Sequence, residues 1–131
     1  MSTLRCSCLC GAVEFEIPSS FERAAFCHCT TCKKISGGVG TASAFVDPAS
    51  IRFVKGRELL QAYQPREGTA KTFCGVCGSN LFGGGWPDSG RASVRLSAID
   101  SPFETWPQSH GFTRSVAPWE TLPEDGLPRT S

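Results

Sequence analysis

The sequence has no long hydrophobic segment and no marked excess of charge of one sign. None of its 131 residues falls in an apolar run near the roughly 20 residues that a helix needs to cross a bilayer. Lysine and arginine together number 13, against 12 aspartates and glutamates, so the basic surface of a nucleic-acid-binding protein is lacking. We therefore expect neither a membrane nor a nucleic acid as a partner.

The first residues, Met1–Arg5, lack the apolar stretch of a secretory signal peptide. We therefore expect a cytoplasmic location, in which structural disulfides are rare. The length predicts a single domain over residues 1–131. Hydrophobic residues make up 40% of the chain, which suffices for a globular core. No pattern in the sequence indicates the oligomeric state.

Methionine and tyrosine occur once each and histidine twice, yet there are eight cysteines. In a reducing compartment, so many cysteines indicate metal binding rather than a disulfide framework. They form three clusters: Cys6-Ser7-Cys8-Leu9-Cys10-Gly11, Cys27-His28-Cys29-Thr30-Thr31-Cys32 and Cys74-Gly75-Val76-Cys77-Gly78. We predict that at least seven of the eight thiols bind metal, as two zinc sites.

Short segments with alternating apolar and polar residues predict a mostly β fold with little helix. A helical turn is expected only from Thr30 to Ile35, ended by the glycines that follow Ser36. The prolines after residue 102 argue against regular strand pairing there, and the aromatic residues among them predict a tail that wraps over the body. The expected strands are Val13 to Ile17, Thr41 to Val46, a hairpin from Ile51 to Tyr63 around Lys55-Gly56, Thr69 to Phe73, and Ala92 to Leu96.

The first and third clusters together predict a structural zinc site. In Cys74-Gly75-Val76-Cys77, two intervening residues let a tight turn direct both sulfurs at one ion, and the glycine that follows permits positive φ. Structural zinc has four ligands, so a second pair is needed, and Cys8 with Cys10 supplies it if both lie on one face of a strand. The alternative, a redox-active Cys-x-x-Cys pair, normally opens a helix in a βαβ unit, and no such unit is predicted.

The second cluster predicts a zinc site of another kind. Cys27, Cys29 and Cys32 offer three ligands within six residues and leave a fourth position open, as in catalytic zinc sites. Closure by Cys6 or His28 would make the site structural instead, and an iron–sulfur cluster would also need a fourth ligand. Because an open trithiolate site loses metal and oxidises more easily, we expect its occupancy to be the lower of the two.

Three thiolates make zinc a weak Lewis acid that is better suited to binding a further thiol than to making hydroxide. Coordination deprotonates the thiol, which can then attack an electrophile. The added negative charge calls for a nearby cation. Lys33 and Lys34 follow Cys32 directly and could supply this charge or bind the substrate, the alternative being that both are simply solvated.

Other candidate residues have simpler interpretations. His28 should point away from the ligands on either side of it. His110 could serve as an acid–base or carboxylate-binding group if the tail folds over the second cluster, and a packed or exposed side chain is the alternative. Arg91 and Arg95 could meet a carboxylate-rich ligand, although an exposed polar strand face is the simpler expectation.

These clusters resemble a known family. Cys8-Leu9-Cys10-Gly11-Ala12-Val13, the stretch from Cys27 to Gly38, and the stretch from Phe73 to Phe82 are similar to the motifs of the glutathione-dependent formaldehyde-activating enzymes, also called the GFA or centromere-protein-V domain. The tail from His110 to Pro128 is similar to that family's C-terminal stretch. The resemblance covers nearly the whole chain.

The resemblance implies an Mss4-like fold of small antiparallel β-sheets around a structural zinc. It places that zinc on Cys8, Cys10, Cys74 and Cys77, and a catalytic zinc on Cys27, Cys29 and Cys32. The activity it implies is that of a carbon–sulfur lyase, which joins glutathione and formaldehyde to give S-(hydroxymethyl)glutathione. The departure is Cys6, which is either a small buried residue or a ligand that closes the second site. Closure would favour a binding or chaperone-like module in which both zincs are structural.

Overall fold

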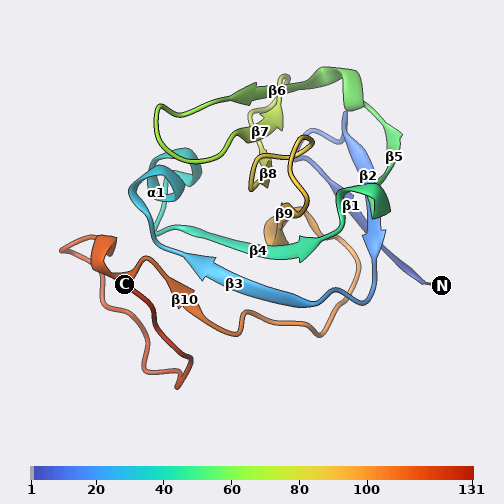
Figure 1. Cartoon of the computed structure of the whole chain (residues 1–131). Coiled ribbons are helices and arrows are strands. Elements are labelled where there is room, and N and C mark those ends of the chain that lie inside the picture. The colour runs from blue at the N-terminus through green and yellow to red at the C-terminus, as the bar shows by residue number, and fades with distance from the viewer. Residues whose placement is uncertain (1) are drawn as a thin grey trace.

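The structure is a computed structural model that describes residues 2–131, and it is built mainly from strands (Figure 1). Its strands are β1 Thr3–Ser7, β2 Glu14–Pro18, β3 Arg23–Cys27, β4 Thr41–Val46, β5 Arg52–Lys55, β6 Leu60–Tyr63, β7 Lys71–Cys74, β8 Asn80–Gly83, β9 Ala92–Arg95 and β10 His110–Gly111. In residues 2–131 the only α-helix is α1, Thr30–Ser36, and short 3₁₀ turns span Pro48–Ser50, Arg57–Leu59, Leu96–Ala98 and Thr113–Ser115. The prediction of a mostly β chain with little helix is confirmed.

The strands form two sheets. The smaller has the order β1-β2-β5, and the larger has the order β10-β3-β4-β9-β8-β7-β6. All neighbours are antiparallel except β10, which runs parallel to β3. In Figure 1 the larger sheet extends from β10 and β3 at the bottom to β6 at the top, with α1 on the left and the smaller sheet on the right. Within residues 2–131, α1 is too short and too polar to span a membrane.

The predicted hairpin around Lys55-Gly56 does not form. β5 pairs with β2 in the smaller sheet, whereas β6 pairs with β7 in the larger one. Gly56 has a φ of 85°, and a Cβ at this position would lie 2.1 Å from the carbonyl oxygen of Ala12. The chain therefore passes close against the β1–β2 connection at Gly56 and continues through a 3₁₀ turn, which carries it from one sheet to the other.

The tail also differs from its prediction in one respect. Despite the surrounding prolines, β10 forms a short ladder with β3, in which His110 is opposite Phe26 and Gly111 is opposite Cys27. The amide of His28 donates to the carbonyl of Gly111 at 3.0 Å. This ladder is possible because the paired residues are not prolines. The tail does lie over the body, as expected, and it runs beside the end of β3 that carries Cys27.

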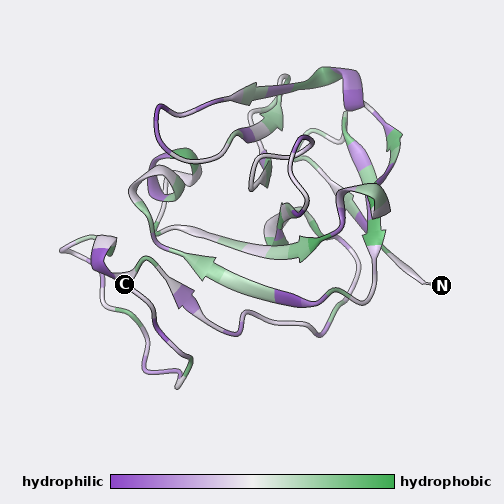
Figure 2. Cartoon of the chain, in the orientation of Figure 1, coloured by the Kyte–Doolittle hydropathy of each residue, from purple (hydrophilic) through white to green (hydrophobic). Residues whose placement is uncertain are grey.

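An aromatic cluster joins the two sheets. Phe15 and Phe53 come from the smaller sheet, while Phe82 and Trp86 come from β8 and the turn after it. The ring centroids of Phe15 and Phe82 are 4.8 Å apart, and those of Phe82 and Trp86 are 4.3 Å apart. Burying aromatic rings of this size dominates the energetics of a small core. Figure 2 shows hydrophobic residues towards the end of β4 and hydrophilic ones at the start of β3 and on β10.

Candidate metal centres

Seven of the eight cysteines gather into two groups. Within each group, the sulfur atoms all lie within 4.8 Å of one another. We call them the four-cysteine group (Cys8, Cys10, Cys74 and Cys77) and the three-cysteine group (Cys27, Cys29 and Cys32). This division of the sulfurs is the one expected from their spacing.

Two similar turns build the four-cysteine group. The sequence had suggested that Cys8 and Cys10 lie on a strand. In the structure they lie in the turn after β1. Gly11 and Gly78 close the two turns with φ of 79° and 82°. Glycine adopts these angles without the steric cost that a Cβ brings, and the turns can therefore direct both pairs of sulfurs inward.

The geometry of the four-cysteine group fits zinc. A Zn–S distance of about 2.3 Å in a tetrahedron requires sulfurs about 3.8 Å apart, and the Cys8 and Cys10 sulfurs are 3.7 Å apart. Backbone amides at Val13 and Val76 donate to the Cys8 and Cys74 sulfurs, each at 3.3 Å. Such hydrogen bonds favour the thiolate form that a metal requires.

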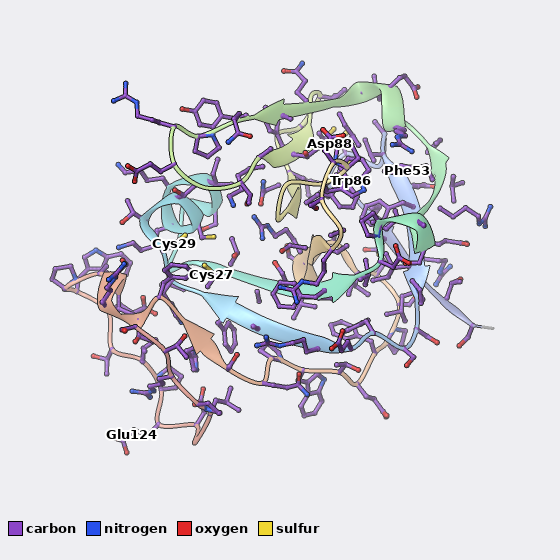
Figure 3. The ribbon with its side chains drawn as sticks, viewed as in Figure 1. Cys27, Cys29, Phe53, Trp86, Asp88 and Glu124 are labelled. Atoms are coloured by element: carbon purple, nitrogen blue, oxygen red, sulfur yellow. The ribbon has the colours of Figure 1, made fainter. Side chains whose placement is uncertain are left out.

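The three-cysteine group is held where β3 ends and α1 begins. Cys27 is the last residue of β3, Cys29 is the N-cap of α1, and Cys32 lies on its first turn. The Cys32 amide donates to the Cys29 sulfur at 3.3 Å. Figure 3 shows Cys27 and Cys29 beside this junction, far from Phe53 and Trp86. Within residues 2–131, no fourth cysteine, histidine, aspartate or glutamate joins the group.

The thiols of the three-cysteine group differ in pKa. A hydrogen bond from Cys27 lowers the pKa of Cys32 to about 5; burial opposes this, and hydrogen bonds from Thr41 and Cys29 reinforce it. The same contact with Cys32, together with burial, raises the pKa of Cys27. Within the group, the thiolate form is therefore favoured at Cys32 over Cys27, and three sulfurs of this kind fit a soft divalent ion such as zinc.

Cys6 lies outside both groups. It sits on β1 with 2% of its surface exposed, and its sulfur contacts the carbonyl of Leu4 at 3.8 Å. Burial raises its pKa to about 12, with smaller contributions from the charges of Asp100 and Glu16. A buried and protonated thiol is a poor metal ligand. The structure thus supports the interpretation of Cys6 as a small buried residue and does not favour its closing the second site.

Two buried histidines and the more exposed Asp125 form a hydrogen-bonded chain that fastens the tail next to the three-cysteine group. His28 Nε2 and His110 Nδ1 are 2.9 Å apart, and His110 Nε2 is 2.7 Å from Asp125 Oδ2. His28 therefore points away from Cys27 and Cys29, as expected. Both ring nitrogens of His110 are engaged within the chain, and its side chain is only 2% exposed. These contacts favour the packed interpretation, and a catalytic role for His110 stays a prediction.

Replacing Asp125 should loosen the tail. Hydrogen bonding to His110 holds the pKa of Asp125 below its ordinary value, so the carboxylate is charged and its hydrogen bond is stronger than a neutral one. We expect Asp125→Asn to accelerate hydrogen exchange at the amides of His110 and Thr130, which pair the tail with itself.

The matched control is Glu124→Gln, which removes the same charge one residue earlier, where the side chain is exposed and points away from the body (Figure 3). This control should leave the exchange rates unchanged. Equal rates in Asp125→Asn and wild type would show that the carboxylate does not secure the tail.

The four candidate cationic side chains have different surroundings. Lys33 turns towards the tail and donates to the carbonyl of Ser115, while Lys34 is exposed. Arg91 is exposed as well, with its guanidinium 4.6 Å from the centre of the Phe45 ring. Arg95 is only 5% exposed. The prediction of an exposed face is therefore wrong for Arg95, because β9 lies between β4 and β8 in the larger sheet.

A cleft of about 680 Å³ lies next to the four-cysteine group and reaches Thr41, the ladder partner of Cys27, although none of the three-cysteine group lines it. Its size is within the range of small-molecule sites. Cys8 and Ser79 line it on the side of the four-cysteine group. On the other side it is lined by Ile35, Thr41 and Arg95. Ile35 follows Cys32 by three residues on α1, so both lie on the same face of the helix.

Comparison with known proteins agrees with this architecture. Residues 3–115 match the family model described as glutathione-dependent formaldehyde-activating enzyme. A Halomonas elongata protein named "Putative glutathione-dependent formaldehyde-activating enzyme" is 34% identical over an alignment of 113 residues, and the match covers 78% of this chain and 69% of that protein. A crystal structure of a Rhodobacter sphaeroides protein has a TM-score of 0.61 at 22% identity, and the match covers 97% of this chain and all of the other. That likeness concerns the fold. The extent of the family match shows that this chain belongs to the glutathione-dependent formaldehyde-activating enzyme family.

Proposed function

We propose that this chain is a zinc-dependent enzyme of the carbon–sulfur lyase type that adds glutathione, or a closely related small thiol, to formaldehyde. The observation that carries the proposal is the three-cysteine group, which has no fourth protein ligand within residues 2–131; Thr41, the ladder partner of Cys27, lines a cleft of small-molecule size. Three protein ligands with one open position are typical of catalytic zinc, whereas four are typical of structural zinc.

Each part of the chain has a separate task in this proposal. The four-cysteine group would hold a structural zinc and so link the β1–β2 turn to the turn after β7. Cys27, Cys29 and Cys32 would hold the second zinc, which would supply a position where a thiol is deprotonated and made nucleophilic at neutral pH. Thr41 helps to lower the pKa of Cys32 by hydrogen bonding and so favours the thiolate form of that sulfur. The cytoplasm, where glutathione is abundant and thiols stay reduced, is the compartment that suits this chemistry.

The proposed reaction joins two small molecules without an oxidant or reductant. The thiolate sulfur attacks the carbonyl carbon and a carbon–sulfur bond forms. The π electrons of the carbonyl move to oxygen, which takes up a proton to give the hydroxyl of S-(hydroxymethyl)glutathione. The proton lost by the thiol balances the one gained by oxygen. The chain needs only to hold the thiolate in the cleft within reach of a small aldehyde.

The alternative function is a binding or chaperone-like module with two structural zincs. It depended on closure of the second site, and Cys6, the cysteine that could close it, is buried elsewhere on β1. No other described feature favours this alternative.

The test uses the zinc-loaded protein. We expect glutathione to change the sulfur coordination of one of two zincs in X-ray absorption, and to bind in calorimetry. We also expect exchange NMR to show S-(hydroxymethyl)glutathione forming faster than its spontaneous rate. S-methylglutathione is the matched control, because it keeps the carboxylates but has no thiol, and it should leave the zinc unchanged. If glutathione perturbs neither zinc, the proposed function is wrong.

A further inference from the structure

Arg95 is a buried cation at the edge of the three-cysteine group. Its Nε donates to Asn80 Oδ1 at 2.5 Å, and its Nη1 donates to Ser43 Oγ at 2.8 Å and to Thr41 Oγ1 at 3.5 Å. Nη2 is buried and has no hydrogen-bond partner in the described part of the chain. A Cβ on Gly83 would lie 2.7 Å from Nη2, so the space that the guanidinium fills depends on glycine at that position.

Within residues 2–131, no carboxylate lies within ion-pair distance of Arg95. Among residues 2–131 the ion pairs are Arg52 with Glu16, Lys55 with Glu14, and His110 with Asp125. The groups that contact the Arg95 guanidinium are neutral amide and hydroxyl oxygens. An isolated buried charge is strongly unfavourable in a folded protein unless an opposite charge lies near it.

The opposite charge comes from the three-cysteine group. In the larger sheet, Thr41 is opposite Cys27 and Ser43 is opposite Arg95, and Arg95 Nη1 reaches the hydroxyl of Thr41, so the start of β4 lies between the arginine and the cysteines. Burial lowers the pKa of Arg95, while negative charge on Cys32, Cys27 and Cys29 opposes that shift. Zinc with three thiolates retains one net negative charge and would carry two after binding a further thiolate.

We propose that the guanidinium of Arg95 is the permanent counter-charge of the three-cysteine group, which stabilises its trithiolate metal site and favours binding of an anionic fourth ligand. Arg95 acts through the site's charge and is a positioning residue. The part of this proposal that concerns the incoming thiol rests on the proposed function, whereas the part that concerns metal affinity does not. Arg95 thus has the charge-compensating role that the sequence had suggested for Lys33 and Lys34.

The fixed charge should also select among ligands. A thiolate gains from the nearby positive charge, whereas neutral water gains much less. Arg95 is held by three strands, since Asn80 lies on β8, Ser43 on β4, and Arg95 itself on β9. Its charge therefore stays in place when a ligand enters or leaves the site, unlike that of a flexible surface lysine.

Two substitutions remove the net charge in different ways. Arg95→Gln deletes the cation. Asn80→Asp keeps the arginine and the hydrogen bond to its Nε, but places a carboxylate of almost the same shape against it. Each changes the protein by one charge, and so does the control, Arg91→Gln, on an exposed arginine over Phe45. Asn80→Asp keeps the test decisive if Arg95→Gln does not fold.

The measurement is competition for zinc with a chromophoric chelator, without glutathione. We expect Arg95→Gln and Asn80→Asp to weaken zinc binding at the three-cysteine group by about tenfold or more, which corresponds to a shift of one pKa unit in its ligands. The zinc affinity of the four-cysteine group should stay at its wild-type value in these variants. In Arg91→Gln, the zinc affinities of both groups should equal those of wild type. Arg95→Lys, which keeps the charge, should restore most of the affinity.

A second measurement concerns the fourth ligand. In cobalt-substituted protein, glutathione should intensify the sulfur-to-cobalt charge-transfer bands of wild type at lower concentration than those of Asn80→Asp. A folded Asn80→Asp protein with wild-type zinc affinity at both groups would overturn the proposal. If the wild-type protein forms no S-(hydroxymethyl)glutathione, the proposed function fails, while the metal-affinity result still decides the role of Arg95.

Discussion

Replacing Cys74 with serine should unfold the protein, while wild type loses its fold only when metal is removed from the four-cysteine group. Cys74 is fully buried and lies at the end of β7, where it is part of the core. A structural zinc in a small domain contributes roughly 10–16 kcal/mol of binding free energy, whereas a whole domain is stable by about 5–15 kcal/mol. The free energy of metal binding at this group is therefore comparable to the free energy of unfolding of the whole domain.

Metal removal should proceed in two steps that circular dichroism and metal analysis can separate. A weak chelator should first take zinc from the three-cysteine group, which offers three ligands, and the fold should remain. A stronger chelator should then take the second equivalent, and the β-sheet signal should be lost with it. As purified, the protein should contain less zinc at the three-cysteine group than at the four-cysteine group.

The control for Cys74→Ser is Cys6→Ser, the same substitution at an equally buried cysteine outside both groups. Cys6→Ser measures the ordinary cost of placing a hydroxyl in the core, about 1–3 kcal/mol, and it should retain both zincs. A Cys74→Ser protein that is folded and as stable as Cys6→Ser would contradict a structural role for the four-cysteine group. Simultaneous release of both zincs on chelation would contradict the expected difference between the groups.

The cysteine groups could be predicted from sequence because their geometry is local. Two thiols separated by one or two residues, with glycine directly after, leave few conformations that do not direct both sulfurs the same way. Gly11 and Gly78 adopt the positive φ that this requires. The pairing of chain-distant turns followed from the need for four ligands, and the structure brings those four sulfurs together.

The environment of Arg95 could not be predicted in the same way. Its burial depends on the strand order β4-β9-β8, which is set by contacts between distant segments and not by local pattern. For the same reason Thr41, Asn80 and Asp125 gave no signal in the sequence. β3 and β8 were not predicted as strands either, because Arg23–Cys27 and Asn80–Gly83 show little of the alternation that would distinguish a strand from a loop.

Replacing Cys29 with serine should abolish the proposed activity and leave the fold intact. Cys29 is the N-cap of α1, and serine is among the best N-cap residues because its hydroxyl also accepts from the helix amides. The substitution therefore keeps the helix start but replaces a thiolate with a neutral hydroxyl, which is a poor zinc ligand. Loss of a residue that merely supports a metal ligand costs about 10–100-fold in affinity or activity, so loss of a ligand itself should exceed this.

The experiment compares wild type, Cys29→Ser and Cys6→Ser by thermal unfolding, zinc content and rate of S-(hydroxymethyl)glutathione formation. Cys29→Ser should unfold within a few degrees of wild type, lose one zinc equivalent, and form product only at the spontaneous rate, whereas Cys6→Ser should retain both zincs and its activity. Unfolding of Cys29→Ser would mean that the three-cysteine group stabilises the fold as the four-cysteine group does, and would support the two-structural-zinc alternative. A folded Cys29→Ser protein with wild-type activity would show that the reaction occurs elsewhere, because a trithiolate site with one ligand removed cannot hold the metal and the substrate thiol in the same geometry.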